Sequence, residues 1–177
     1  MPPSKLSPKQ INQLADWVAS YIIEQRSHFY VKAKPIEPDQ VSLLRPFFPE
    51  DVLCEARVVR GRASKPPFYS QLRSLGITNA PPFSEMAGIT FQDVIVHVEP
   101  LQTPLLFHEL VHAVQYKHLG LQGFAERYVR GFLAGGSYEE IPLEKQAYGL
   151  EERFAKNPTV PFSVEADVRE RIRQHQF

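Results

Sequence analysis

Apolar residues recur every three or four positions along much of this chain, which is the period of a helix that buries one face. The pattern predicts helices over residues 8–26, 39–45, 67–75, 104–119, 124–133, 142–156 and 164–174. Ser7 and Pro8 suit the start of the first helix, because serine is a good cap and proline fits the first helical position. Glycines at positions 76, 120, 135 and 136 mark expected helix ends.

Three short runs follow a different pattern, since they are rich in β-branched residues and partly alternate. They cover residues 52–59, 86–91 and 94–98, and the last two flank Gln92 and Asp93 as the strands of a hairpin would. A small, mainly antiparallel sheet packed on helices places the chain in the α+β class. We expect one domain over residues 1–177, with a helical, proline-rich part (1–50), a core (52–156) and a C-terminal helix (163–174).

Composition narrows the classes of function. The 20 lysines and arginines balance the 20 aspartates and glutamates, so no net charge attracts nucleic acid or an anionic membrane. No run of 18 apolar residues is present, and the segment from Met1 to Pro8 lacks the order of a secretory signal. Cys54 is the single cysteine, which excludes an intramolecular disulfide and a cysteine-based zinc cluster. We therefore expect a cytoplasmic protein whose metal ligands are histidines and carboxylates.

The helix expected over residues 104–119 contains the motif His108-Glu109-Leu110-Val111-His112. Residues four apart on a helix share one face about 6 Å apart along the axis, so both imidazoles can reach one metal ion. Glu109 lies beside them, where a metal-bound water would be. We expect Thr103 as the N-cap of this helix, Pro104 as its first residue and Gly120 just after its end. Its buried face is expected to consist of Leu106, Leu110, Val111 and Val114. The pattern predicts a Zn²⁺ site with His108 and His112 as ligands.

A zinc ion held by two histidines needs a third protein ligand, and the fourth position is left to water in a catalytic site. The carboxylates downstream that can supply it are Glu139, Glu140, Glu144 and Glu151. Glu144 is preferred because it lies in the first turn of the helix that begins at Pro142, and no cation follows four residues later to pair with it. Glu140 is the next choice.

These residues resemble a known family. The segment His-Glu-Leu-Val-His-Ala-Val-Gln, then Tyr128, a glycine-rich break and Ile141-Pro-Leu-Glu-Lys-Gln-Ala147 are similar to the small bacterial gluzincin-like metallopeptidases. In gluzincins a later Glu, often within E-x-x-A, is the third ligand, and Glu144 to Ala147 match that form. The resemblance covers about residues 89–154 and implies a minimal zincin-like fold, in which a strand before the metal helix lies along the substrate. Residues 1–85 have no counterpart in it.

The chemistry implied is hydrolysis of a peptide bond in a peptide or protein substrate. Zinc lowers the pKa of its water and polarises the carbonyl, while Glu109 takes the proton from water and passes it to the leaving amine. The oxyanion needs one more donor besides zinc. Tyr148, one turn beyond Glu144, is the first candidate for this donor, and Tyr138 in the glycine loop is the second.

A non-catalytic alternative stays open, namely a metal-containing module that binds a peptide or partner, or regulates, without turnover. Gln115 lies one turn after His112, where a hydrogen bond to this ligand and an ordinary contact between helices are both open. His97 in the second strand of the hairpin is expected to be a polar residue on the sheet face. The basic cluster is expected to be a solvated rim, and it consists of Arg57, Arg60, Arg62 and Lys65. The oligomeric state is left open.

Overall fold

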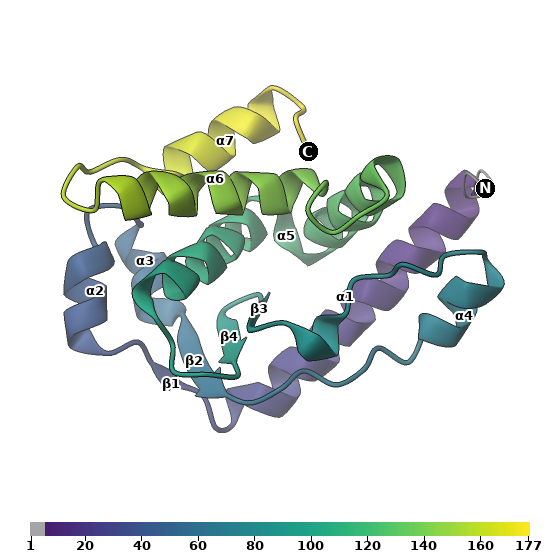
Figure 1. Ribbon diagram of the computed structural model, residues 1–177, viewed down its shortest axis with the longest axis horizontal. Coiled ribbons are helices and arrows are strands. Elements are labelled where there is room, and N and C mark those ends of the chain that lie inside the picture. Colours follow the sequence, from purple (N-terminus) through teal and green to yellow (C-terminus); the bar gives the residue numbers. More distant parts are fainter. Residues whose placement is uncertain (1–5) are drawn as a thin grey trace.

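Figure 1 shows the computed structural model of the protein, which describes residues 6–177. Residues 1–5, on which part of the expectation about a secretory signal rests, lie outside the described residues. The predicted α+β class is confirmed. The helices are α1 (Pro8–Tyr30), α2 (Pro38–Leu44), α3 (Glu50–Glu55), α4 (Tyr69–Ser74), α5 (Thr103–Gly135), α6 (Pro142–Lys156) and α7 (Val164–Arg173), with a short 3-10 turn η1 (Phe83–Glu85).

The sheet is small and mainly antiparallel, as predicted. Its strands are β1 (Lys34–Pro35), β2 (Arg57–Arg60), β3 (Gly88–Phe91) and β4 (Val94–His97), in the order β1-β2-β4-β3. The predicted hairpin is β3 with β4, which pair antiparallel so that Ile89 lies opposite Val96. β1 also pairs antiparallel with β2, whereas β2 and β4 run parallel. β3 therefore lies at one edge of the sheet.

Helix α5 is the central element of the fold (Figure 1). α6 packs along it with α7 beyond, while the sheet lies on the other side and α1 crosses both α5 and the sheet. The apolar face predicted for α5 is fully buried, with Leu106, Leu110, Val111 and Val114 at 0 % exposure. Hydrophobic burial of this face therefore holds α5 between α6 on one side and the sheet on the other.

The long helix α5 is bent at Gly120, as its sequence predicted. Gly120 has φ 68° and ψ 168°, a backbone conformation that a residue with a Cβ rarely adopts. The bend separates a first segment, residues 103–119, from a second segment, residues 121–135, which ends before the left-handed Gly136. The prediction of Thr103 as N-cap was wrong by one residue. Gln102 has the extended cap conformation, and Pro104 is tolerated because amides in the first turn need no partner within the helix.

The strand predicted over residues 52–59 was wrong in its first half. Residues Glu50–Glu55 form α3, and only Arg57–Arg60 form a strand. Glu50 and Asp51 lie in the first turn of α3, where the helix dipole favours acidic side chains, and this outweighs the β-branched composition of the run. The first helix begins as predicted, with Ser7 in a capping box, but extends to Tyr30 rather than ending near Arg26.

The turn of the hairpin is fastened to α1. Gln92 takes a left-handed φ of 62°, and Asp93 next to it accepts hydrogen bonds from the guanidinium of Arg26. The two distances are 2.5 Å from Nε and 2.8 Å from Nη2, which is the bidentate geometry that arginine and carboxylate prefer. The N-terminal helix therefore fixes the position of β3. Over residues 6–177, none of the helices combines the length and the apolar character needed to cross a membrane.

Candidate metal centre

Three buried side chains converge where α5 and α6 meet. His108 and His112 come from the first segment of α5, and Glu144 comes from the first turn of α6. Their exposures are 4 %, 6 % and 3 %. The Nε2 atoms of the two histidines lie 3.2 Å apart, and Glu144 Oε2 lies 3.4 Å from His108 Nε2 and 3.3 Å from His112 Nε2. The group is close enough to bind one metal ion.

These distances match the edges of a tetrahedral metal site. Nitrogen and oxygen ligands lie about 2.0–2.1 Å from zinc, so two ligands of one tetrahedron are separated by about 3.3–3.4 Å. Among the described residues, Glu144 Oε2 is the buried side-chain polar atom that has no hydrogen-bond partner. An unpaired buried acceptor costs about 1–3 kcal/mol, and more for a charged group, which a cation bound between the three atoms would recover. The residues therefore fit a metal ion.

Hydrogen bonds to the opposite ring nitrogens orient both imidazoles. His108 Nδ1 lies 3.0 Å from Glu151 Oε2, and His112 Nδ1 lies 2.8 Å from Gln115 Oε1. Because a carboxylate only accepts, His108 donates from Nδ1, and in the neutral ring this leaves the lone pair on Nε2. Gln115 donates from its Nε2 to the carbonyl of Leu143, so its Oε1 faces His112 and accepts. Both histidines therefore present lone pairs to the same point, as metal ligands do.

The electrostatics of the group favour a positive charge at its centre. Burial alone would lower the pKa of His108, but the contacts with Glu144 and Glu151 and the charges of the nearby carboxylates raise it to about 10. Burial alone would raise the pKa of Glu144, but the charge of His112 and the contacts with both imidazoles lower it well below its usual range. Either a proton or a metal cation can supply this positive charge, and the two compete for the same nitrogen and oxygen atoms.

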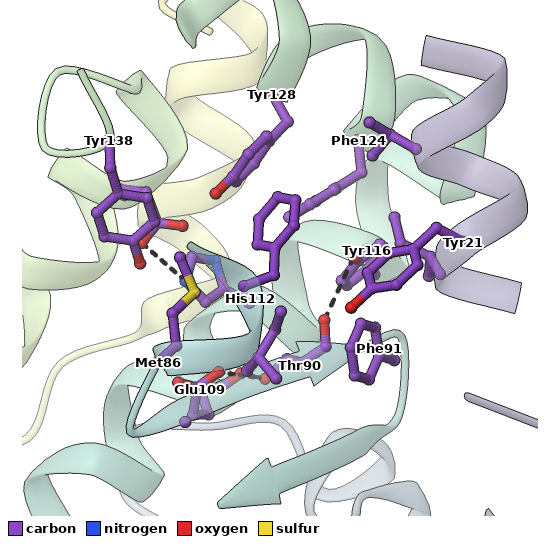
Figure 2. Close-up of a pocket in the computed structure, with 16 residues that line it drawn as sticks. Tyr21, Met86, Thr90, Phe91, Glu109, His112, Tyr116, Phe124, Tyr128 and Tyr138 are labelled. Atoms are coloured by element: carbon purple, nitrogen blue, oxygen red, sulfur yellow. Dashed lines mark hydrogen bonds and ion pairs between the residues drawn. The ribbon is translucent and has the colours of Figure 1, made fainter. Parts of the chain in front are cut away.

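Glu109 lies next to this group and is held by the edge strand. The hydroxyl of Thr90 on β3 lies 2.6 Å from Glu109 Oε2, to which it donates (Figure 2). The other carboxylate oxygen lies against Gly88, where an added Cβ would be only 2.6 Å from Oε1. Burial raises the pKa of Glu109, and the charges of His112 and His108 and the bond from Thr90 offset only part of this rise. A raised pKa is the property that a general base needs near neutral pH.

A narrow cavity connects these polar groups with aromatic side chains. Glu109, His112 and Glu144 line one part of it, and the other walls come from α1, β3, η1 and the second segment of α5. Figure 2 shows Tyr128, Phe124, Tyr116 and Tyr21 around this space. Its free volume is about 40 Å³, room for about three water molecules. The cavity therefore has room for water beside Glu109, next to a mostly aromatic and apolar wall.

The two tyrosines predicted as oxyanion donors are placed differently. Tyr138 lines the cavity, and its pKa is raised by burial and by the nearby charge of Glu144. Tyr148 is 47 % exposed, and its ring lies 4.4 Å from that of His108, tilted by 58° to it. Tyr128, which was not among the donors predicted from the sequence, also points its hydroxyl into the cavity from the second segment of α5 (Figure 2).

Apart from Glu151, the other candidates from the sequence lie away from the three ligands. Glu139 is exposed, and Glu140 pairs with Lys145 at the surface, Nζ to Oε2 2.6 Å. His97 is half-buried on β4 with its Nδ1 2.8 Å from the carbonyl oxygen of Glu99. Glu151, proposed only as a ligand, contacts a ligand instead. The basic cluster contacts main-chain oxygens, through Arg57 to Cys54, Arg60 to Val98 and Arg62 to Ser84.

The sequence did not predict the contact of Thr90 with Glu109 or that of Glu151 with His108. Glu151 follows Glu144 by seven residues, two turns along the same face of α6, and this spacing was a usable signal. Thr90 meets Glu109 across 19 residues, for which the sequence offers no local pattern. Comparison with family models, with curated proteins and with solved structures found no match to this chain.

Proposed function

We propose that this protein is a zinc-dependent hydrolase that cleaves peptide bonds. One observation carries the proposal: the three buried ligand atoms of His108, His112 and Glu144 have the mutual distances of a tetrahedral zinc site. Three protein ligands leave a fourth position for water or substrate, which is the arrangement of a catalytic site rather than a structural one. A bound divalent cation supplies Lewis acidity, which polarises a carbonyl and acidifies water.

Glu109 is the general base of the proposed reaction. It accepts a proton from the attacking water and delivers it to the leaving amine. Thr90 holds one carboxylate oxygen, so Glu109 needs little reorganisation before it reacts. Tyr138 is a better placed donor to the oxyanion than Tyr148, because it lines the cavity while Tyr148 is half exposed.

A peptide is the substrate class that the edge of the sheet favours. Within residues 6–177, β3 pairs with β4 alone, so its other edge is open to pairing with an extended chain except at Thr90, whose carbonyl accepts a hydrogen bond from the hydroxyl of Tyr116. This edge also carries Gly88 and Thr90, the two residues that touch Glu109. The gluzincin-like resemblance of residues 89–154 supports the same proposal, since it implies the same ligands, base and edge strand.

Metal analysis and a peptide library test the proposal with two matched variants. The wild type should bind about one zinc per chain and cleave some library peptides. Glu109→Gln should keep its zinc and lose at least about 10²-fold in kcat, because it cannot accept a proton. Glu140→Gln removes an exposed carboxylate that pairs only with Lys145, and should leave both measurements unchanged.

The outcomes separate the possible roles. A Glu109→Gln variant that cleaves as fast as wild type would show that Glu109 is not the base. Zinc-dependent binding of peptides without any turnover by wild type would favour the alternative, a metal-containing binding or regulatory module. Absence of zinc binding by the wild type would refute both.

A further inference from the structure

We propose that the C-terminal helix α7 is a working part of the metal centre, in which Asp167, Gln146 and Gln115 are positioning residues for His112. The inference rests on the zinc site of the proposed function and not on turnover. Four side chains from three helices form a continuous series of hydrogen bonds that ends on a ligand. They are Asp167 on α7, Gln146 on α6, and Gln115 and His112 on α5.

Each link of this relay has an ordinary hydrogen-bond length. His112 Nδ1 and Gln115 Oε1 are 2.8 Å apart, Gln115 Nε2 and Gln146 Oε1 are 3.0 Å apart, and Gln146 Nε2 and Asp167 Oδ1 are 2.7 Å apart. The two glutamines are buried, at 0 % and 1 % exposure. Buried amides are costly unless they are bonded, so this pair is a specific feature and not a chance contact.

Two groups that can only accept hydrogen bonds set the direction of every bond in the relay. The Asp167 carboxylate can only accept, so Gln146 donates from Nε2 and turns its Oε1 towards Gln115. The carbonyl of Leu143 also only accepts, so both hydrogens of the Gln115 amide are used, one for Leu143 and one for Gln146. Gln115 Oε1 is then left for His112 and accepts a hydrogen bond from Nδ1–H. The relay thereby holds His112 in the tautomer whose Nε2 can bind a metal.

Helix α7 also has a contact with α5 that does not lead to the ligands. Glu165, two residues before Asp167, pairs with Lys117 Nζ at 2.9 Å and with His118 Nε2 at 2.8 Å. Removal of Glu165 weakens the docking of α7 but leaves the relay in place. Glu165→Ala is therefore a matched control for Asp167→Ala, because both remove one partly exposed carboxylate from the same helix.

Zinc affinity, measured by competition with a chromophoric chelator, tests the relay. Changes in groups that support metal-bound histidines lower metal affinity about 10–100-fold. Gln115→Ala should therefore lose about 10–100-fold and Asp167→Ala, two links further away, about 3–10-fold. Glu165→Ala should stay within twofold of wild type. Asp167→Asn should recover most of the affinity, since its amide oxygen can still accept from Gln146.

A second measurement separates positioning from a general loss of folding. With Co²⁺ in place of zinc, the visible absorption bands report ligand geometry, and they should shift in Gln115→Ala and Asp167→Ala but not in Glu165→Ala. Equal losses of zinc affinity in Asp167→Ala and Glu165→Ala would overturn the proposal, because only docking of α7 would then matter. Wild-type affinity in Asp167→Ala would overturn it too, as would an equal loss in Asp167→Asn and Asp167→Ala. These measurements need no substrate, so the proposal can survive failure of the peptidase assignment.

Discussion

Replacement of Glu144 by glutamine is the most direct perturbation of the proposed site. Glutamine has nearly the same shape as glutamate, so the packing at the start of α6 is kept. The change removes the negative charge that lies 3.3 and 3.4 Å from the two imidazole nitrogens. It also makes the buried Oε2 position neutral, and this is the atom without a hydrogen-bond partner. The variant therefore removes one ligand and little else.

The expected magnitude follows from the energy of a zinc site. Zinc sites with four protein ligands bind with about 10–16 kcal/mol, so one ligand contributes about 2.5–4 kcal/mol. Since about 1.4 kcal/mol corresponds to a tenfold change, Glu144→Gln should weaken zinc binding about 10²–10³-fold. The charge of Glu144 is almost completely buried, at 3 % exposure, so solvent screens little of this loss.

Competition with a chromophoric chelator measures this loss, and circular dichroism of the metal-free proteins checks that the fold is unchanged. Glu140→Gln is the matched control, because Glu140 is four residues earlier, exposed and paired with Lys145. It should bind zinc as wild type does. A loss of less than about tenfold in Glu144→Gln would refute the assignment of the third ligand, and a similar loss in Glu140→Gln would show that the effect is not specific.

Three further predictions concern the surroundings of the ligands. Thr90→Val should lower kcat about tenfold or more with unchanged zinc content, because Glu109 loses the hydrogen bond from the threonine hydroxyl. Thr90→Ser keeps a hydroxyl and should therefore keep kcat near that of wild type. Peptide cleavage measures kcat, and metal analysis measures the zinc content. Tyr138→Phe should lower kcat about 10²-fold with little change in KM, and kinetics equal to wild type would exclude it as oxyanion donor. The pKa of Glu165 is lowered by its hydrogen bond from a lysine, so its contribution to stability is present above the ordinary pKa near 4.3 and is lost as pH falls through the lowered value. Urea unfolding of the metal-free Glu165→Gln variant should therefore depend less on pH between about 3 and 5 than that of wild type, by under about 1 kcal/mol because the pair is partly exposed.

The helices were predicted well from the sequence because their signals are local. Caps, prolines, glycines and apolar spacing lie within a few residues of one another, and they located α5, its bend at Gly120 and the start of α6. The prediction of a strand from Val52 to Val59 was wrong in its first half because it also rested on local signals alone. Short apolar runs do not distinguish strand from helix, and the acidic residues that begin α3 lie just before the run.

The candidate site was predictable only in part. The two histidines lie one helical turn apart on the same face, so their convergence follows from helix geometry. The placement of Glu144 followed from its position in the first turn of α6. The contacts of Thr90 with Glu109, and of Asp167 with Gln146, join elements that only the tertiary fold brings together. Side-chain partners of this kind have no spacing that a single sequence can reveal.

The bidentate bond between Arg26 and Asp93 means that the base Glu109 and the metal ligands are supported by different parts of the chain. β3, whose Thr90 bonds Glu109, is anchored by α1, which contains none of the proposed ligands. The groups that bond the two histidine ligands all lie in the C-terminal half of the chain. Changes on one side should alter how fast water reacts, and changes on the other should alter how tightly the cation is kept. Under the proposed function, metal affinity and turnover can thus be adjusted independently.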